Sequence, residues 1–314
     1  MMEKPFVYAV IGTGAVGGYY GSLLQRSGLE VHYLLHSDYD HVKQSGLTIA
    51  SVDGDFALPR VNAYNDPQTM PRCDVAMVAL KATANGILPD ILSCVLNENG
   101  IVLLLQNGFG QEDFIAAIAG VKTILAGLCF VCTTKTGPGA ICHQDYGSVI
   151  LAQFAKDGSP SGITQVMQRI AADLTAAGVS VEMSPDLIDA RWRKLVWNIP
   201  FSGLTTLFQA DTARIMNWPP MERLVKDLMR EVVEGASALG RIIPPAFIDK
   251  MMADTRKMRP YFSSMKFDFD AGKELELEAM YHKPLEAVAA HGRRLIRIEM
   301  LYEELTFLQG KSRI

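Results

Sequence analysis

Cysteine is scarce in this sequence, with five residues in a chain of 314. An odd number spread over a long chain does not match the disulfide framework of small secreted domains, so we expect reduced thiols. Cys129 and Cys132 form a C-x-x-C pattern, but they lie in an apolar run, and no second cysteine pair follows at the spacing of a zinc site. The pattern therefore predicts buried or half-buried strand cysteines and no metal.

The sequence also lacks an excess of positive charge and any long apolar run. Its formal net charge of -4 argues against a general attraction to nucleic acid or anionic lipid. The longest uncharged stretch, 195–210, is shorter than a bilayer span and contains Asn198 and Pro200. The apolar run after Lys4 has no small-residue cleavage site behind it, and we interpret it as a strand. We therefore expect a cytoplasmic protein with no nucleic-acid or membrane partner.

The chain is long enough for two domains, and 49% of its residues are hydrophobic. In the first half, short apolar runs alternate with helical patterns, which is typical of βαβ units and a mostly parallel sheet. The expected strands span 7–12, 31–35, 75–80, 101–105 and 123–131. The expected helices span 15–27, 85–96 and 112–119. This order predicts a doubly wound α/β Rossmann domain.

The pattern changes after Thr136, where glycines separate two β-prone runs and predict an antiparallel addition to the sheet. A helix at 163–177 and a short strand at 179–183 are expected next. From Asp186 onward almost every segment is typical of helix, with breaks near prolines 219, 244 and 260. We therefore expect a cofactor-binding Rossmann domain at 1–183 and an all-α substrate domain at 184–314.

The clearest motif is a G-x-G-x-x-G run that follows a strand and opens a helix, as dinucleotide binding requires. Gly12 permits a tight turn, Gly14 leaves room for the pyrophosphate, and Gly17 lets the helix pack closely on the strand. The phosphates would then lie at the positive end of the helix. The predicted cofactor turn comprises Gly12, Thr13, Gly14, Ala15, Val16 and Gly17.

The end of the second strand bears on the choice between NAD and NADP. The position where an acid would bind a free ribose 2′-hydroxyl holds no acid, because the strand is followed by His36 and Ser37. Both side chains can donate hydrogen bonds to a 2′-phosphate, which favours NADP. Two alternatives stay open: His36 and Ser37 merely end the strand, or Asp38 reaches a ribose.

A second motif, WRKLVWN at 192–198, lies in the expected helical domain. Lys194 and Asn198 are four residues apart and share one helical face, so they direct an ammonium and an amide toward one point. An ammonium can stabilise the negative charge that hydride transfer builds on a carbonyl oxygen. The alternative is a surface lysine lying over a tryptophan.

Together the two motifs resemble the ketopantoate reductase (2-dehydropantoate 2-reductase) family of NADPH-dependent reductases, over nearly the whole chain. Further matching elements are Leu80-Lys81-Ala82, Gln106-Asn107-Gly108 and Ser263-Ser264-Met265. The resemblance implies reduction of a small 2-keto acid by NADPH, 2-dehydropantoate to pantoate above all, as in pantothenate and coenzyme A biosynthesis.

The resemblance also implies roles for individual residues. Lys194 would be the catalytic general acid, and Asn198 would hydrogen-bond the substrate. Lys81 and Asn107 would lie near the nicotinamide, with Asn107 also at the substrate. The remaining substrate-binding residues would be Ser202, Ser264 and Glu276.

Several positions depart from the family pattern. His36 stands where many relatives have an arginine for the 2′-phosphate, and Ser202 stands where an asparagine is common. Pro200 is expected to kink its helix and free the carbonyl of Val196. Tyr281 and His282 could reshape the pocket wall and select another 2-keto acid, although an ordinary interfacial role for His282 is the alternative.

Glu276 conflicts with a straight helix, because it lies about 120° around such a helix from Ser264. Glu278 fits one face better. A break near Gly272 would restore Glu276 to the site.

Two rival functions remain. A β-hydroxyacid dehydrogenase would also carry a helical lysine and asparagine, and a non-catalytic NADP-binding redox sensor would need the cofactor turn alone. The apolar C-terminal helices make a homodimer reasonable.

Overall fold

The structure, a computed structural model, describes residues 4–311. Its contacts divide the chain into two compact units. The first comprises Met1–Gln106 and Gln111–Leu187, and the second comprises Asn107–Gly110 and Ile188–Ile314. The division after Leu187 lies close to the boundary that we expect near Ser184. The assignment of the short segment Asn107–Gly110 to the second unit was not expected.

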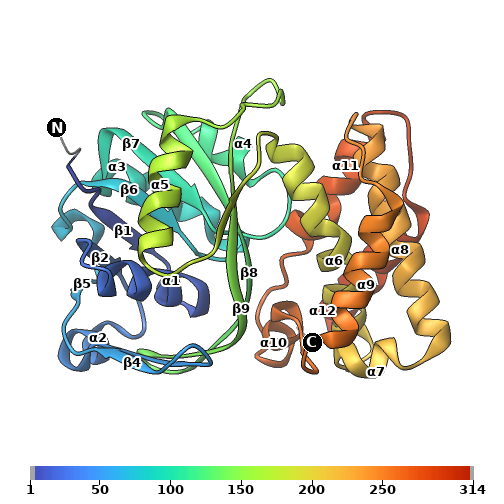
Figure 1. The fold of residues 1–314 in the computed structure, drawn as a ribbon, viewed down its shortest axis with the longest axis horizontal. Helices are drawn as coiled ribbons and strands as arrows, with labels where there is room; N and C mark the ends of the chain where they lie inside the picture. The colour runs from blue at the N-terminus through green and yellow to red at the C-terminus, as the bar shows by residue number, and fades with distance from the viewer. Residues whose placement is uncertain (1–3, 312–314) are drawn as a thin grey trace. The chain divides into compact units, whose positions relative to one another are not determined.

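One mixed sheet of ten strands forms the first unit (Figure 1). Its strands are β1 (Tyr8–Ile11), β2 (Val31–Leu34), β3 (Leu47–Ser51), β4 (Phe56–Leu58), β5 (Asn62–Tyr64), β6 (Cys73–Val78), β7 (Leu96–Leu104), β8 (Thr123–Gly137), β9 (Ala140–Gln153) and β10 (Val181–Met183). They are ordered β4-β3-β9-β8-β7-β6-β1-β2-β5, with β10 beside β9. The strands from β8 to β5 along this order are parallel, and β9 is antiparallel to β8. The expected Rossmann sheet with an antiparallel addition is confirmed.

Alternate residues of the central strands enter two separate apolar cores, one on each face of the sheet. On β1, Tyr8 and Val10 belong to one core, whereas Ala9 and Ile11 belong to the other. Helices α1 (Ala15–Arg26) and α5 (Gln165–Ala176) cover the first core, and α3 (Leu88–Val95) and α4 (Gln111–Ala116) cover the second (Figure 1). Because both faces are buried, the parallel strands form continuous apolar runs in the sequence.

Three strands of this unit were not expected, and all are short or partly polar. Strand β3 pairs with β9 in parallel and with β4 in antiparallel orientation, while β5 adds to the other edge beside β2. The segments have three to five residues, at or below the length at which alternation indicates a strand. Short helical segments complete the unit: α2 (Tyr39–Ser45), η1 (Pro67–Thr69) and η2 (Ala82–Ile87).

The C-x-x-C cysteines lie on β8, as expected. Cys132 is buried, Cys129 is half-buried, and neither forms a disulfide. Burial raises the pKa of the Cys132 thiol to about 12. The thiol is therefore protonated at neutral pH, which fits a packing role, and the burial and strand position of both cysteines confirm that part of the prediction.

In the described part of the second unit, all the regular structure is helical. Its elements are α6 (Leu187–Leu207), α7 (Thr212–Met216), α8 (Pro219–Ala238), α9 (Pro245–Lys257), α10 (Ser264–Asp270), the π-helical turn η3 (Glu278–His282), α11 (Lys283–Ala289) and α12 (Ile296–Lys311). They enclose one apolar core that includes the fully buried Trp192. Pro219 and Pro245 occupy first-turn positions of α8 and α9, where proline is favoured. Between residues 4 and 311, no helix combines the length and the hydropathy of a membrane span.

Candidate active site

The three fingerprint glycines have three distinct local environments. Gly12 has a φ of +94°, and a Cβ there would lie 2.6 Å from the backbone nitrogen of Leu80. A Cβ at Gly17 would lie 2.3 Å from the carbonyl oxygen of Gly12. A Cβ at Gly14 would meet nothing within 4 Å. Gly12 and Gly17 are thus required by the fold itself, whereas Gly14 borders open space.

The N-terminus of α1 can accept an anion. Gly14 is its N-cap, no side chain caps the helix, and the first turn contains no acidic residue. The first backbone N–H groups therefore keep the positive end of the helix available to a phosphate. The Thr13 hydroxyl donates to the carbonyl of Leu34, 3.3 Å away, and links this turn to the end of β2. These residues fit the pyrophosphate of a dinucleotide.

The loop after β2 contains two exposed side chains that can donate hydrogen bonds, His36 and Ser37, and one buried carboxylate, that of Asp38. The Asp38 carboxylate lies 2.5 Å from the Lys135 ammonium and accepts a 3.0 Å hydrogen bond from the Gly139 amide. Burial alone would raise the pKa of Asp38, but these partners hold the pKa below its ordinary value. Asp38 is thus already engaged within the protein.

Lys81 lies beside the glycine turn of the same unit. It is the N-cap residue of η2, and the next residue back, Leu80, is the one that Gly12 approaches closely. Side-chain amides form hydrogen bonds to the residues around Lys81. The Gln106 side chain donates to the Leu80 carbonyl over 2.9 Å and to the Asn85 amide oxygen over 2.6 Å. Sequence reasoning missed Asn85, because nothing local connects it to a residue twenty-one positions later.

Helix α6 carries three of the predicted side chains. Lys194 and Ser202 are each only 5% exposed, and Asn198 is half-buried. Successive four-residue steps turn the helix by about 40°, so the three side chains share one face. The alternative of a surface lysine lying over tryptophan is wrong, because Lys194 is buried. Pro200 lies within α6 without ending it.

The loop at Asn107 packs against the helical unit. Gly108 has a φ of +93°, and a Cβ there would lie 2.5 Å from the carbonyl oxygen of Ala279. The next amide, that of Phe109, donates to the same oxygen over 2.9 Å. The Phe109 ring lies 5.9 Å from that of Trp192, in the WRKLVWN motif. Asn107 therefore belongs to the same unit as Lys194, although it follows a strand of the sheet.

The structure separates the two glutamates that sequence reasoning left open. Helix α10 ends at Asp270, and Gly272 has a φ of +63°, so no straight helix connects Ser264 with either glutamate. Glu276 is buried, whereas the side chain of Glu278 is 64% exposed and pairs with His282. The burial favours Glu276 as the site residue. The straight-helix expectation was wrong because the chain breaks near Gly272.

Ser264 is exposed and is the first residue of α10, whereas its neighbour Ser263 caps the helix. Ser263 is buried, accepts a hydrogen bond from the Lys266 amide, and lies 2.7 Å from the Thr205 hydroxyl on α6. This contact ties the start of α10 to α6. The hydroxyl of Ser264 is therefore not the cap of its own helix.

Tyr281 is a core residue and does not form a pocket wall, which corrects that expectation. Its side chain is fully buried and its hydroxyl donates to the Ile199 carbonyl over 2.9 Å. A Cβ at Gly203 would lie 2.7 Å from the same hydroxyl. Tyr281 thus holds η3 against the middle of α6. His282 pairs with Glu278 at 3.0 Å, which favours the ordinary role for this histidine.

Comparison with known proteins identifies relatives along nearly the whole chain. The family model described as ketopantoate reductase PanE/ApbA matches residues 8–156, and its C-terminal counterpart matches residues 186–309. A 2-dehydropantoate 2-reductase of Nostoc sp. is 49% identical over 98% of this chain and 96% of its own length. The crystal structure of a 2-dehydropantoate 2-reductase from Geobacter metallireducens GS-15 aligns with a TM-score of 0.91 at 37% identity, covering 97% of this chain and 99% of that one. A D-mandelate dehydrogenase solved with NADH and anilino(oxo)acetate shares the fold, with a TM-score of 0.85 at 18% identity over 98% and 99% of the two chains.

Proposed function

Because the chain belongs to the ketopantoate reductase family of oxidoreductases, we propose that it reduces 2-dehydropantoate to pantoate with NADPH. The membership agrees with the resemblance carried by the two sequence motifs. The glycine motif forms the turn before α1, and the WRKLVWN motif lies within α6.

The burial of Lys194 on α6 is the observation that carries this proposal. A lysine only 5% exposed has lost most of its hydration, so the fold must compensate its charge through nearby groups or through a ligand. In the proposed reaction the ammonium donates its proton to the keto oxygen of the substrate while a hydride adds to the carbon. The oxygen becomes a hydroxyl, and the amine regains a proton from water. Positioned proton donors of this kind typically contribute about 10² to 10⁴ in rate.

The first unit would hold the cofactor. The backbone from Gly12 to Gly17 would surround the pyrophosphate at the start of α1, and His36 and Ser37 would face the adenosine ribose. Bound NADPH would supply the hydride. Lys81, beside the glycine turn, would help to hold the nicotinamide half.

The second unit would hold the keto acid. Asn198 and Ser202, on the same face of α6 as Lys194, would donate hydrogen bonds to substrate oxygens. Glu276 would accept a hydrogen bond from the substrate hydroxyl. Asn107 and Ser264 would contact the acid from the two segments that pack near α6.

The test is consumption of NADPH or NADH with 2-dehydropantoate, a panel of other 2-keto acids, and 3-hydroxy acids in the oxidative direction. We expect the highest kcat/KM for 2-dehydropantoate with NADPH. Lys194→Ala should lower that kcat/KM by about 10² to 10⁴. A higher kcat/KM for another acid would reassign the substrate, and activity on 3-hydroxy acids would favour the β-hydroxyacid dehydrogenase. Tight NADPH binding without turnover of any acid, in wild type and variant alike, would favour the redox sensor.

A further inference from the structure

The long β8–β9 hairpin places a lysine at the loop after β2. Lys135 lies near the end of β8, and its ammonium is 2.5 Å from the carboxylate of Asp38. The Lys135 side chain is 33% exposed, whereas that of Asp38 is 9% exposed. The ion pair therefore has a buried acid on one side and an accessible cation on the other.

The same part of the hairpin packs against the first turn of α1. Lys135 is the partner of Ile141 across the hairpin, and a Cβ at Gly18 would lie 2.2 Å from the Cδ1 atom of Ile141. Gly18 directly follows the last fingerprint glycine. Lys135 thus contacts the loop where the adenosine ribose of a Rossmann cofactor is bound, and its cross-strand partner packs on the helix that follows the glycine turn.

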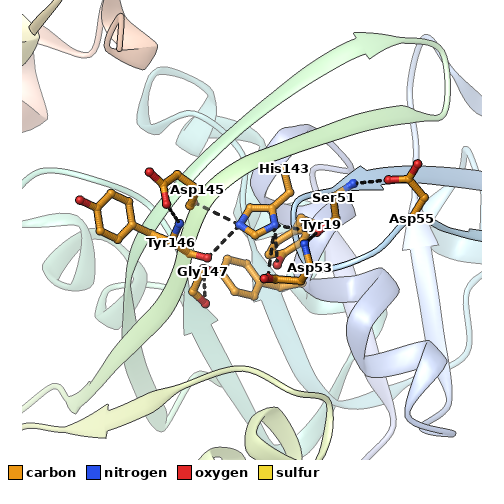
Figure 2. A network of polar contacts seen from close by, with 9 residues as sticks. Tyr19, Ser51, Asp53, Asp55, His143, Asp145, Tyr146 and Gly147 are labelled. Atoms are coloured by element: carbon orange, nitrogen blue, oxygen red, sulfur yellow. Dashed lines mark hydrogen bonds and ion pairs between the residues drawn. The ribbon is translucent and has the colours of Figure 1, made fainter. Parts of the chain in front are cut away.

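A buried histidine anchors this hairpin to α1 and β3 (Figure 2). The Nε2 atom of His143 on β9 lies 3.1 Å and 2.9 Å from the carbonyl oxygens of Asp145 and Tyr146, which can only accept. Nε2 therefore carries the hydrogen. Nδ1 lies 3.2 Å from the Tyr19 hydroxyl on α1 and 2.9 Å from the Ser51 hydroxyl on β3. The network fixes the position of β9 and, through its pairing with β8, of the strand that carries Lys135.

Lys135 supplies the positive charge that the loop after β2 needs to bind an anion. A bare Asp38 carboxylate would repel a phosphate, but Lys135 and the Gly139 amide both engage it. A lysine ammonium has three N–H donors, so it can hold Asp38 and still donate to a second anion. His36 and Ser37, both exposed, add further donors on the same loop.

We propose that Lys135 binds the 2′-phosphate of NADPH and sets the preference for NADPH over NADH. In this chain the cation comes from the sheet extension and not from the residue after β2, where His36 stands. The proposal rests on the proposed function, because it assumes that a nicotinamide dinucleotide occupies the glycine turn.

The experiment measures dissociation constants of NADPH, NADH, 2′-AMP and 5′-AMP for purified variants, by cofactor fluorescence and calorimetry. Lys135→Met should weaken NADPH and 2′-AMP binding roughly ten- to a hundredfold, the usual effect of losing a charged hydrogen bond, and leave NADH and 5′-AMP little changed. Lys135→Arg should retain most of the preference. Lys122→Met is the matched control, because Lys122 is exposed just before β8 and contacts Asn99 instead.

A double variant separates direct binding from simple neutralisation of Asp38. Asp38→Asn combined with Lys135→Met removes the buried carboxylate together with its cation, which also guards against misfolding of the single variant. We expect this double variant to remain weak for NADPH and 2′-AMP. Recovery of wild-type NADPH affinity in the double variant, or unchanged affinity in Lys135→Met, would overturn the proposal. Failure of wild type to bind either dinucleotide would instead overturn the proposed function.

Discussion

The glycine turn before α1 and the α6 face that carries Lys194, Asn198 and Ser202, which we propose as the cofactor and substrate sites, are built by different means. The turn uses backbone groups and open space, since Gly14 borders nothing within 4 Å. The proposed substrate site would use the side chains of Lys194, Asn198 and Ser202 together with segments distant in sequence, and Lys194 and Ser202 are buried. The difference teaches that a backbone site can be specified by one short motif, whereas a side-chain site depends on the packing of the whole unit.

The largest expected effect on cofactor binding distinguishes two glycines within the turn itself. Gly14→Ala should leave stability unchanged, because its Cβ meets no atom within 4 Å, and weaken NADPH binding by about a hundredfold by displacing the pyrophosphate from backbone donors. Gly17→Ala should instead destabilise the fold by about 1–3 kcal/mol, because its Cβ meets the Gly12 carbonyl. Urea unfolding and NADPH titration of both variants check this. If both variants lose the same stability and the same NADPH affinity, Gly14 and Gly17 do not differ in role as we propose.

The next effect concerns the loop that packs on the helical unit. Gly108→Ala should lower kcat/KM for the keto acid roughly tenfold, because a Cβ at this positive φ collides with the Ala279 carbonyl and displaces Asn107. NADPH affinity should change less. Gly86→Ala is the control, since its Cβ meets no atom within 4 Å. An unaltered kcat/KM in Gly108→Ala would contradict the proposed contact between Asn107 and the substrate.

A smaller effect compares the two glutamates. Glu276→Gln should raise KM for the keto acid up to about tenfold, as expected for one weakened hydrogen bond, whereas Glu278→Gln should leave it unchanged because Glu278 faces solvent and pairs with His282. Steady-state kinetics of both variants decide the matter. A larger effect in Glu278→Gln would reverse the assignment.

The smallest effect is the pH dependence of the Asp38 ion pair. Because the pKa of Asp38 is lowered in the folded protein, its carboxylate stabilises the fold above the ordinary aspartate pKa of about 3.9. That contribution is lost as the pH falls through the lowered value. The difference in unfolding free energy between wild type and Asp38→Asn should therefore shrink on acidification below about pH 4. A difference that is constant with pH would exclude this role for the carboxylate.

The sequence predicts best where the determining interactions are local. The apolar run of β1, the glycine spacing and the helical pattern of α1 act within a few residues, and all three agree with the structure. Strands β3 to β5 escaped prediction because segments of three to five residues with polar members carry little periodicity.

The sequence predicted most of the residues that the candidate site contains, but it did not predict which of them lie next to one another. Lys135 joins Asp38 from a distant strand, and no local pattern indicates that pairing. Glu276 could not be separated from Glu278 until the chain break near Gly272 was known. Both cases depend on tertiary packing, which can overrule an argument based on one regular helix.

Titration of NADPH into Lys194→Ala, beside wild type and Gly14→Ala, tests the division of tasks between the two units most directly. We predict that Lys194→Ala binds NADPH with nearly wild-type affinity although its turnover falls by about 10² to 10⁴, while Gly14→Ala binds NADPH about a hundredfold more weakly than wild type. Lost NADPH binding in Lys194→Ala, or turnover close to that of wild type, would contradict the account.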